Sequence, residues 1–216
     1  MKTKIVLWLV WLIFTAYTLL ISPLDHPGVL TLMEKLIKFQ ISDINAFVVS
    51  IFWLMGVWPM IYAGFLFIDE RTQNISAWPS FLTSNGAGVM GLLPYLIVRR
   101  PNQEFSSYKD IWIKILDSRL YGIFLSLVTL GLLVYAIWAG DWQDFVQQWH
   151  TNPFVHLISL DFCLMCLVFP AVLGDDMGRR GLRDFRIFWA VSLVPLGGAL
   201  AYLSLRPSLP NVHKPI

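Results

Sequence analysis

Long runs without a charged residue dominate the chain. Asp, Glu, Lys and Arg are all absent from residues 5–24, 44–68, 72–98, 120–140, 145–160 and 187–205. A helix needs about 20 mostly apolar residues to cross a hydrocarbon core of roughly 30 Å, and every run except 145–160 reaches about that length. The exception continues through a single acid, Asp161, as far as Leu173. Backbone groups in lipid must bond within their own segment, and the alternation of a β-barrel is absent, so the pattern predicts helices.

We therefore predict an all-α, polytopic transmembrane helical bundle with about six spans in a single membrane domain. The first connector holds a surface helix at about 29–39, and an apolar piece of the connector 99–119 lies in the membrane interface. The tail 206–216 contains three prolines and is predicted to be extended. The predicted spans cover residues 5–21, 44–68, 77–98, 120–139, 153–173 and 187–205.

A similar succession of residues occurs in two places. The second predicted span contains Pro59 and is followed by Asp69, and the fifth contains Pro170 and is followed by Asp175. If this is a repeat with three spans in each half, the two halves are inverted in the membrane, as in many transporters. The alternative is chance, because the intervals from proline to acid differ and because prolines in spans and charges at their ends are common.

Composition agrees with a membrane protein, and charge indicates its orientation. The chain is 56% hydrophobic and 14% charged, whereas soluble domains carry about 25% charged residues. A net charge of +2 is too small to indicate nucleic-acid binding, so the predicted partners are the lipid bilayer and other membrane proteins. Lys and Arg concentrate in connectors 99–119 and 175–186, which the positive-inside rule places in the cytoplasm or stroma, with both termini outside. Lys2 and Lys4 argue against that placement of the amino terminus.

Asp161 is the most informative polar residue, because it lies near the middle of the fifth span. An acid at the centre of a membrane helix costs roughly 2.5–3.5 kcal/mol. It either forms a proton or substrate site or hydrogen bonds to a neighbouring helix, with Tyr62, Ser126 or Thr129 as candidate partners. His156 is a second candidate polar residue, but it lies about 140° away around the helix, so the two do not form a dyad. No cofactor is predicted, and a pigment or haem on His156 is the alternative.

Two short motifs favour packing over chemistry. Cys163 and Cys166 form a C-x-x-C pair in mid-helix, far from the helix N-terminus that stabilises a thiolate, and the chain has no further cysteines to act as a shuttle. We interpret them as small packing residues, with membrane thiol redox chemistry as the alternative. Gly86, Gly88 and Gly91 match G-x-G-x-x-G, but outside a βαβ unit they indicate close helix packing instead of phosphate binding.

Four charged residues follow the fifth span: Asp175, Asp176, Arg179 and Arg180. On a continuing helix, Asp175 meets Arg179 and Asp176 meets Arg180 four residues later. The cluster is therefore predicted to form salt bridges, or to contact anionic lipid headgroups through its arginines. Paired acids could instead hold Mg²⁺, but a second aspartate-rich motif is lacking, so no metal site is predicted.

Four stretches carry a resemblance: GVWPMIYAGFLFIDERTQNISAWPSF (56–81), GLLPYLIVRRPNQEF (91–105), GDWQDFVQQ (140–148) and FPAVLGDDMGRRGL (169–182). They are similar to an uncharacterised family of polytopic membrane proteins of cyanobacteria and plastids. The resemblance covers most of residues 44–210 and implies a thylakoid or plasma membrane of a photosynthetic organism. It implies no activity and no site residues.

These features predict a non-enzymatic integral membrane protein that acts as an accessory or assembly factor through helix–helix contacts in a photosynthetic membrane. The short connectors and the lack of a convergent catalytic constellation favour this interpretation. Two alternatives stay open. One is a small proton-coupled transporter centred on Asp161, and the other is a membrane-embedded thiol redox or lipid enzyme.

Overall fold

The computed structural model describes residues 2–20 and 27–210, and this part of the chain contains helices and their connections without a strand. Five helical segments are long and apolar enough to cross a membrane, so the predicted helical membrane bundle is confirmed. The helices are α1 (Lys2–Leu20), α2 (Pro27–Ile37), α3 (Ala46–Glu70), α4 (Trp78–Val98), α5 (Ile111–Leu116), α6 (Arg119–Ala139), α7 (Trp142–Thr151), α8 (Pro153–Val168), α9 (Pro170–Arg179), α10 (Phe185–Leu193) and α11 (Gly197–Leu205).

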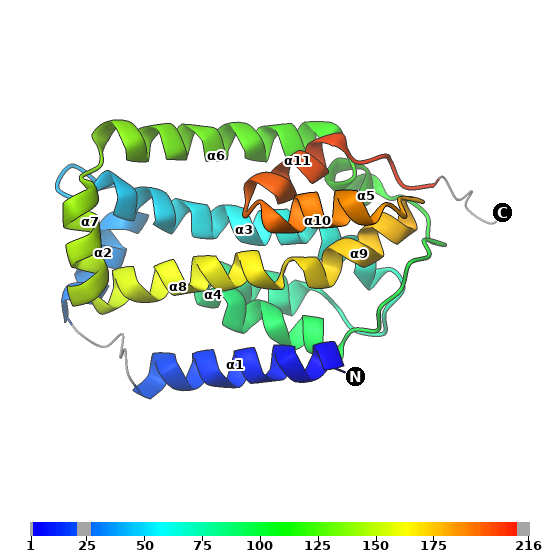
Figure 1. Cartoon of the computed structure of the whole chain (residues 1–216), viewed down its shortest axis with the longest axis horizontal. Helices are drawn as coiled ribbons and strands as arrows, with labels where there is room; N and C mark the ends of the chain where they lie inside the picture. The colour runs from blue at the N-terminus through cyan, green and yellow to red at the C-terminus, as the bar shows by residue number, and fades with distance from the viewer. Residues whose placement is uncertain (1, 21–26, 211–216) are drawn as a thin grey trace.

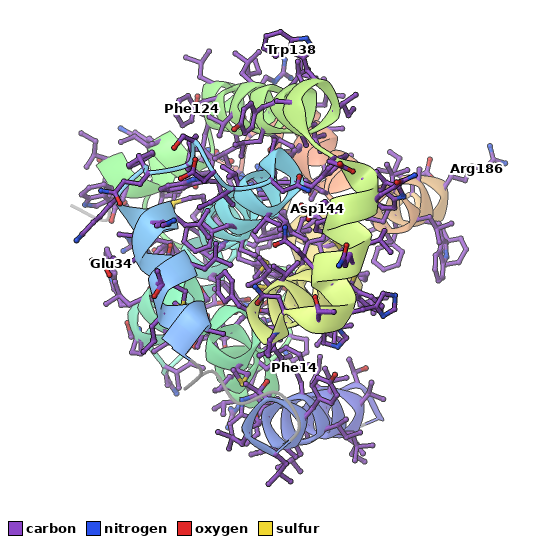
Figure 2. The ribbon with its side chains drawn as sticks, turned by 90° about the vertical axis from the view of Figure 1, so that its left-hand side faces the viewer. Phe14, Glu34, Phe124, Trp138, Asp144 and Arg186 are labelled. Carbon is purple, nitrogen blue, oxygen red and sulfur yellow. The ribbon has the colours of Figure 1, made fainter. Side chains whose placement is uncertain are left out.

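The long helices α1, α3, α6 and α8–α9 lie along the longest axis of the molecule (Figure 1). At one end, α2 and α7 lie across them, and Figure 2 looks onto that end. The surface helix predicted at 29–39 is α2. The other end is formed by residues 69–77, 99–119, 175–186 and 206–210, and we call it the charged end. The beginning of α1 is also there, because Lys4 Nζ donates to the carbonyl of Val98 at 3.3 Å.

The helix α4 folds back on itself at Gly88, which has the non-helical angles φ 52° and ψ −130°. The residues that flank α4 consequently meet. The Gln73 amide donates to the Arg100 carbonyl at 2.7 Å and accepts from the Arg100 N–H at 2.8 Å. A straight helix of this length would separate them by about 30 Å. Instead of the simple span predicted at 77–98, α4 is a hairpin that enters the bundle from the charged end and returns to it.

A second hairpin is formed by α10 and α11. The chain turns at Leu196, whose φ is 58°. Both outer ends reach α9, because Phe188 of α10 lies against Gly174 and Arg206, after α11, donates to Asp176 at 3.1 Å. The segment predicted as a span at 187–205 therefore also enters and leaves at the charged end (Figure 1).

A glycine lets the two arms approach each other in each hairpin. A Cβ on Gly91 would lie 2.5 Å from the carbonyl carbon of Thr83 in the opposite arm. A Cβ on Gly198 would lie 2.1 Å from the carbonyl oxygen of Val191. Small residues at helix contacts allow backbones to pack closely in membranes, so the predicted packing role of the glycines holds at Gly91, within one hairpin.

The two hairpins belong to two copies of one structural unit. Asp69 at the end of α3 accepts hydrogen bonds from Tyr95 and Arg99, which follow it by 26 and 30 residues. Asp176 in α9 accepts hydrogen bonds from Tyr202 and Arg206, which follow it at the same two intervals. The same shift in residue number that relates Asp69 to Asp176 also relates Asn45, which caps α3, to Asn152, which caps α8.

The two units run in the same direction, so the inverted arrangement that three spans in each half would produce is not present. Phe52 and Phe154, near the beginnings of α3 and α8, have ring centroids 6.2 Å apart, and Asp69 and Arg179 form an ion pair near the ends of α3 and α9. Inversion followed from counting three crossings in each half. Because the third segment of each half is a hairpin, the second unit starts on the same side as the first.

Aromatic side chains fill the contact between the two units. Phe169 packs on Trp58, Tyr62 and Phe65 of α3 with centroid distances of 6.0, 6.1 and 5.2 Å. The Tyr62 hydroxyl donates to the carbonyl of Met165 at 2.7 Å. The centre of the bundle is therefore packed, and its larger cavities lie between other pairs of elements.

Candidate functional site

The first hairpin is held to its helix by a buried group that we call the first clamp, which consists of Asp69, Tyr95 and Arg99. Arg99 Nε and Nη2 donate to the two Asp69 oxygens, each at 2.9 Å, and the Tyr95 hydroxyl donates at 3.0 Å. Arg179 also pairs with Asp69, and Arg99 reaches Asp175. Burial by itself would lower the pKa of Arg99, but the contacts with Asp69 and Asp175 outweigh it and raise the pKa.

The second clamp, Asp176 with Tyr202 and Arg206, repeats this arrangement. Asp176 accepts from the Tyr202 hydroxyl at 2.8 Å, from Arg206 Nη1 at 3.1 Å and from Arg180 Nε at 2.8 Å. Arg180 also donates to Asp117 at 2.5 Å, which ties the start of α6 to this group. Burial by itself would lower the pKa of Arg180, but its contacts with Asp176 and Asp117 raise it.

The predicted cluster of Asp175, Asp176, Arg179 and Arg180 is thus a buried salt-bridge network. Of the two predicted pairs, Asp176 with Arg180 is present. Asp175 and Arg179 instead bind residues of the first clamp, because the hairpin of α4 brings Arg99 beside them. Arg179 and Arg180 are buried, so their guanidinium groups are not available to lipid headgroups.

Asp161 lies at the tip of the first hairpin. Its Oδ1 accepts the backbone N–H of Val89, the first residue after the turn, at 2.8 Å. The predicted partners Tyr62 and Ser126 instead donate to backbone carbonyls. The third, Thr129, has a buried hydroxyl without a hydrogen-bond partner. Val89 was not predicted as the partner of Asp161, because in a straight α4 the Val89 N–H would bond to a backbone carbonyl of the same helix.

His156 is separate from Asp161, as predicted. Its Nε2 lies 2.6 Å from the hydroxyl of Tyr17, and its Nδ1 lies 3.0 Å from the carbonyl of Trp149. Both ring nitrogens are therefore engaged in hydrogen bonds. Among the described residues, no group of three or more His, Cys, Asp or Glu side chains could hold a metal ion.

The thiols of Cys163 and Cys166 are both free. Cys163 is exposed on the surface of α8 and lines a shallow groove beside α1, whereas Cys166 is partly buried. The two residues remain within one continuous helix, which ends before Pro170. Partial burial is compatible with a packing role for Cys166, whereas the exposed side chain of Cys163 does not fit the packing role predicted for it.

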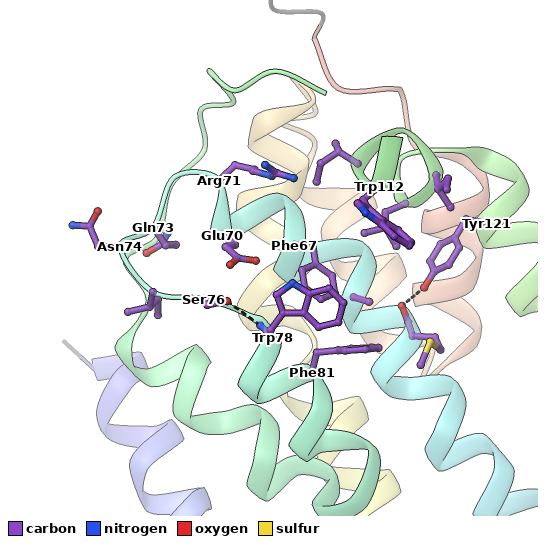
Figure 3. A pocket seen from close by; sticks show the side chains of 16 residues that line it. Phe67, Glu70, Arg71, Gln73, Asn74, Ser76, Trp78, Phe81, Trp112 and Tyr121 are labelled. Carbon is purple, nitrogen blue, oxygen red and sulfur yellow. Dashed lines mark hydrogen bonds between the residues drawn. The ribbon is translucent and has the colours of Figure 1, made fainter. Parts of the chain in front are cut away.

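A large cavity lies at the charged end, between α3, the first arm of α4, α5 and α6, and we call it the aromatic cleft. Its volume is about 830 Å³. Figure 3 shows the aromatic side chains grouped in it, with Glu70 and Arg71 nearby. Its walls are mainly Met60, Ala63, Phe67, Trp78, Phe81, Trp112, Ile113, Ile115, Leu116 and Tyr121, and its polar rim is Glu70, Arg71, Gln73, Asn74 and Ser76.

Local interactions fix the roof and one wall of the cleft. The roof, α5, begins at Asp110, whose carboxylate caps the helix by accepting from the Ile113 N–H at 2.9 Å and pairs with Arg71. One wall is positioned by Tyr121, whose hydroxyl donates to the carbonyl of Met60 at 2.6 Å. Burial by itself would raise the pKa of Asp110, but the Ile113 N–H and Arg71 lower it below its ordinary value.

Sequence reasoning missed the aromatic cleft, because its walls come from four separate elements. Tryptophans near the ends of apolar segments, such as Trp78 and Trp112, are typical of the ordinary aromatic belt of a membrane protein. A signal was nevertheless present. In both clamps an arginine lies 30 residues after the aspartate that it binds. Pairing of Asp69 with Arg99 requires α4 to return to the charged end, and this places Trp78 beside the end of α3.

No family model, no curated protein and no solved structure matches this chain.

Proposed function

We propose that this is a non-enzymatic membrane protein that binds a lipid-like amphiphile in the aromatic cleft. The cleft itself carries the proposal. Its volume of about 830 Å³ lies within the range of small-molecule sites, and it combines apolar walls with a polar rim. An amphiphile would place its chain against Met60, Trp112 and Leu116 and its headgroup at the rim near Glu70.

We also propose that the charged end faces the cytoplasm or stroma. Of the lysines and arginines in residues 2–20 and 27–210, only Lys35 and Lys38 belong to the opposite end. If every predicted segment crossed the membrane once, Lys4, Arg71 and Arg206 would lie on the side opposite the basic connectors 99–119 and 175–186. Because α4 and α10–α11 are hairpins, these three residues lie on the same side as those connectors. The positive-inside rule supports this orientation, which puts both the start of α1 and residues 206–210 inside, where the sequence alone predicted both termini outside.

The resemblance to proteins of cyanobacteria and plastids supports a thylakoid or plasma membrane as the location. In that setting, the bound amphiphile would be a component of the membrane leaflet at the charged end. As an accessory or assembly factor, the protein would hold this amphiphile next to the proteins of a photosynthetic complex.

Quenching of tryptophan fluorescence tests amphiphile binding. The protein in nanodiscs is titrated with a brominated single-chain amphiphile, and we expect a saturable component of quenching from Trp78 and Trp112. The double variant Trp78→Phe/Trp112→Phe keeps aromatic walls and should lose that component. The matched control Trp138→Phe, on the outer face of α6 with Trp138 87% exposed, should retain it (Figure 2). Quenching that never saturates, or that is equal in the double variant and the control, contradicts the proposal.

The position of Asp161 favours a second candidate function, a proton-coupled carrier. Carriers commonly place discontinuous helices of two repeated units near the membrane midplane, and here Asp161 accepts the N–H that follows a broken helix. A pH-sensitive dye in proteoliposomes measures proton flux. Asp161→Asn keeps an acceptor for Val89 and should abolish the flux of a carrier. Equal proton leak for wild type, variant and empty liposomes rejects this function.

A further inference from the structure

We infer that the aromatic cleft selects amphiphiles with a cationic headgroup, such as a quaternary ammonium or a protonated amine. This inference rests on the proposed function, because it names the class of amphiphile that the same cleft would bind. Three features of the cleft favour a cation: the arrangement of the aromatic rings, the balance of charge at the rim, and the directions of the two helices that meet there.

Three aromatic rings of the cleft form a contiguous group. The centroid of Phe67 lies 4.8 Å from that of Trp78 and 5.4 Å from that of Phe81, and Trp78 and Phe81 are 5.9 Å apart. Trp78 is also half exposed, so part of its indole faces the open cleft. The faces of aromatic rings attract cations, and groups of such rings are the usual receptors for quaternary ammonium ions.

Glu70 places a negative charge at the rim of the cleft that no described cation pairs with. Its carboxylate lines the cleft, is partly exposed, and has no hydrogen bond or ion pair among the described residues. The cation beside it, Arg71, is already paired with Asp110. The Gln73 amide is occupied at both its oxygen and its nitrogen by the backbone of Arg100. A cationic headgroup would therefore meet an unpaired carboxylate, whereas an anionic one would have to compete with Asp110 for Arg71.

The helix ends at the rim favour the same sign of charge. Glu70 is the last residue of α3, and the C-terminal end of a helix carries partial negative charge. The N-terminus of α4 borders the cleft too, and free N–H groups there would attract anions. However, the Trp78 N–H is directed to Ser76 Oγ at 3.4 Å, Pro79 has no N–H, and the Phe81 N–H bonds to the Ala77 carbonyl, so that only the Ser80 N–H of this turn is without an acceptor among the described residues.

A matched series of detergents tests the inference. Dodecyltrimethylammonium, dodecyl maltoside and dodecyl phosphate share one chain length and differ in headgroup charge. Each displaces the brominated amphiphile from the protein in nanodiscs, and the displacement gives its relative affinity. We expect the cation to bind about tenfold more tightly than the neutral detergent, since cation–π attraction and one charge pair together contribute this much.

Two variants assign the selectivity to the cleft. Glu70→Gln should remove most of the tenfold preference, measured as the ratio of the dodecyltrimethylammonium and dodecyl maltoside affinities within the same variant. The matched control Glu104→Gln, an exposed acid of the connector outside the cleft, should keep the preference. Equal affinity for all three detergents, tightest binding of dodecyl phosphate, or a preference that survives Glu70→Gln overturns the cationic selectivity while amphiphile binding stands. Failure of every detergent to displace the brominated probe overturns amphiphile binding itself.

Discussion

Gly88 and Asp161 fit against each other at the tip of the first hairpin. A Cβ on Gly88 would lie 1.5 Å from Asp161 Oδ2, while Asp161 Oδ1 accepts the N–H of the next residue, Val89. The glycine therefore meets two requirements at once, a positive φ and the space for a carboxylate. The carboxylate in turn satisfies an N–H group that the broken helix leaves free in the interior of the bundle.

The first prediction concerns Gly88→Ala. An alanine would add backbone strain at φ 52° and overlap with Asp161, so we expect a loss of about 3 kcal/mol of stability. The matched control is Gly86→Ala, because a Cβ at Gly86 meets no atom within 4 Å. Thermal unfolding in a mild detergent measures both variants. Equal unfolding midpoints for the two variants would show that the hairpin tip does not have this geometry.

The second prediction compares the two clamps. Arg99→Met and Arg206→Met each remove a donor from a buried aspartate, and breaking a buried pair costs about 3–5 kcal/mol. The two variants should therefore be similarly destabilised in thermal unfolding. Lys38→Met, which breaks an exposed pair with Glu34, should leave the unfolding midpoint nearly unchanged, because solvent screens an exposed ion pair. If only one of the two clamp variants is destabilised, the two units do not rely on equivalent clamps.

The third prediction concerns pH and the roof of the aromatic cleft. The pKa of Asp110 in the folded protein lies below its ordinary value of 3.8. Such a group stabilises the folded state at pH values above its unfolded pKa, and this stabilisation disappears as the pH falls through the folded pKa. The protection factors of the α5 amides, which are exchange rates corrected for the intrinsic pH dependence of exchange, should therefore fall in acid below about pH 4. Asp110→Asn should exchange faster than wild type at neutral pH and lose the acid dependence, whereas an unchanged pH profile in the variant would contradict the role of Asp110.

Hydrophobic patterning predicts where the helices lie, but it does not predict their direction. The apolar run at 72–98 is long enough to cross a membrane, and its length is the same whether the helix is straight or folded at Gly88. The turn depends on one backbone conformation and on a contact with Asp161, which is distant in sequence. For the same reason, the glycines at 86, 88 and 91 could be interpreted only as packing residues.

The repeat is visible in the sequence at the aspartates and the residues that follow them, and not at the prolines. Pro59 and Pro170 are not equivalent in the two units, so the intervals measured from them disagree. The aspartates Asp69 and Asp176 are equivalent, and each is followed by tyrosine and arginine at equal intervals. Of the charged cluster, only the local pair of Asp176 and Arg180 was predictable, because the other partners depend on where the hairpins return.

The aromatic cleft and the proposed orientation both depend on the hairpin of α4, because it forms one wall of the cleft and brings the basic connectors 99–119 and 175–186 to the same end as Arg71. Single cysteines at the exposed positions Asn74, Arg100 and Lys38 test it in a variant with Cys163 and Cys166 replaced by alanine. A membrane-impermeant maleimide is applied to intact and to inverted membrane vesicles. We predict that Asn74→Cys and Arg100→Cys react from the same side and Lys38→Cys from the other. Labelling of Asn74→Cys and Arg100→Cys from opposite sides would show that α4 crosses the membrane, which contradicts the hairpin.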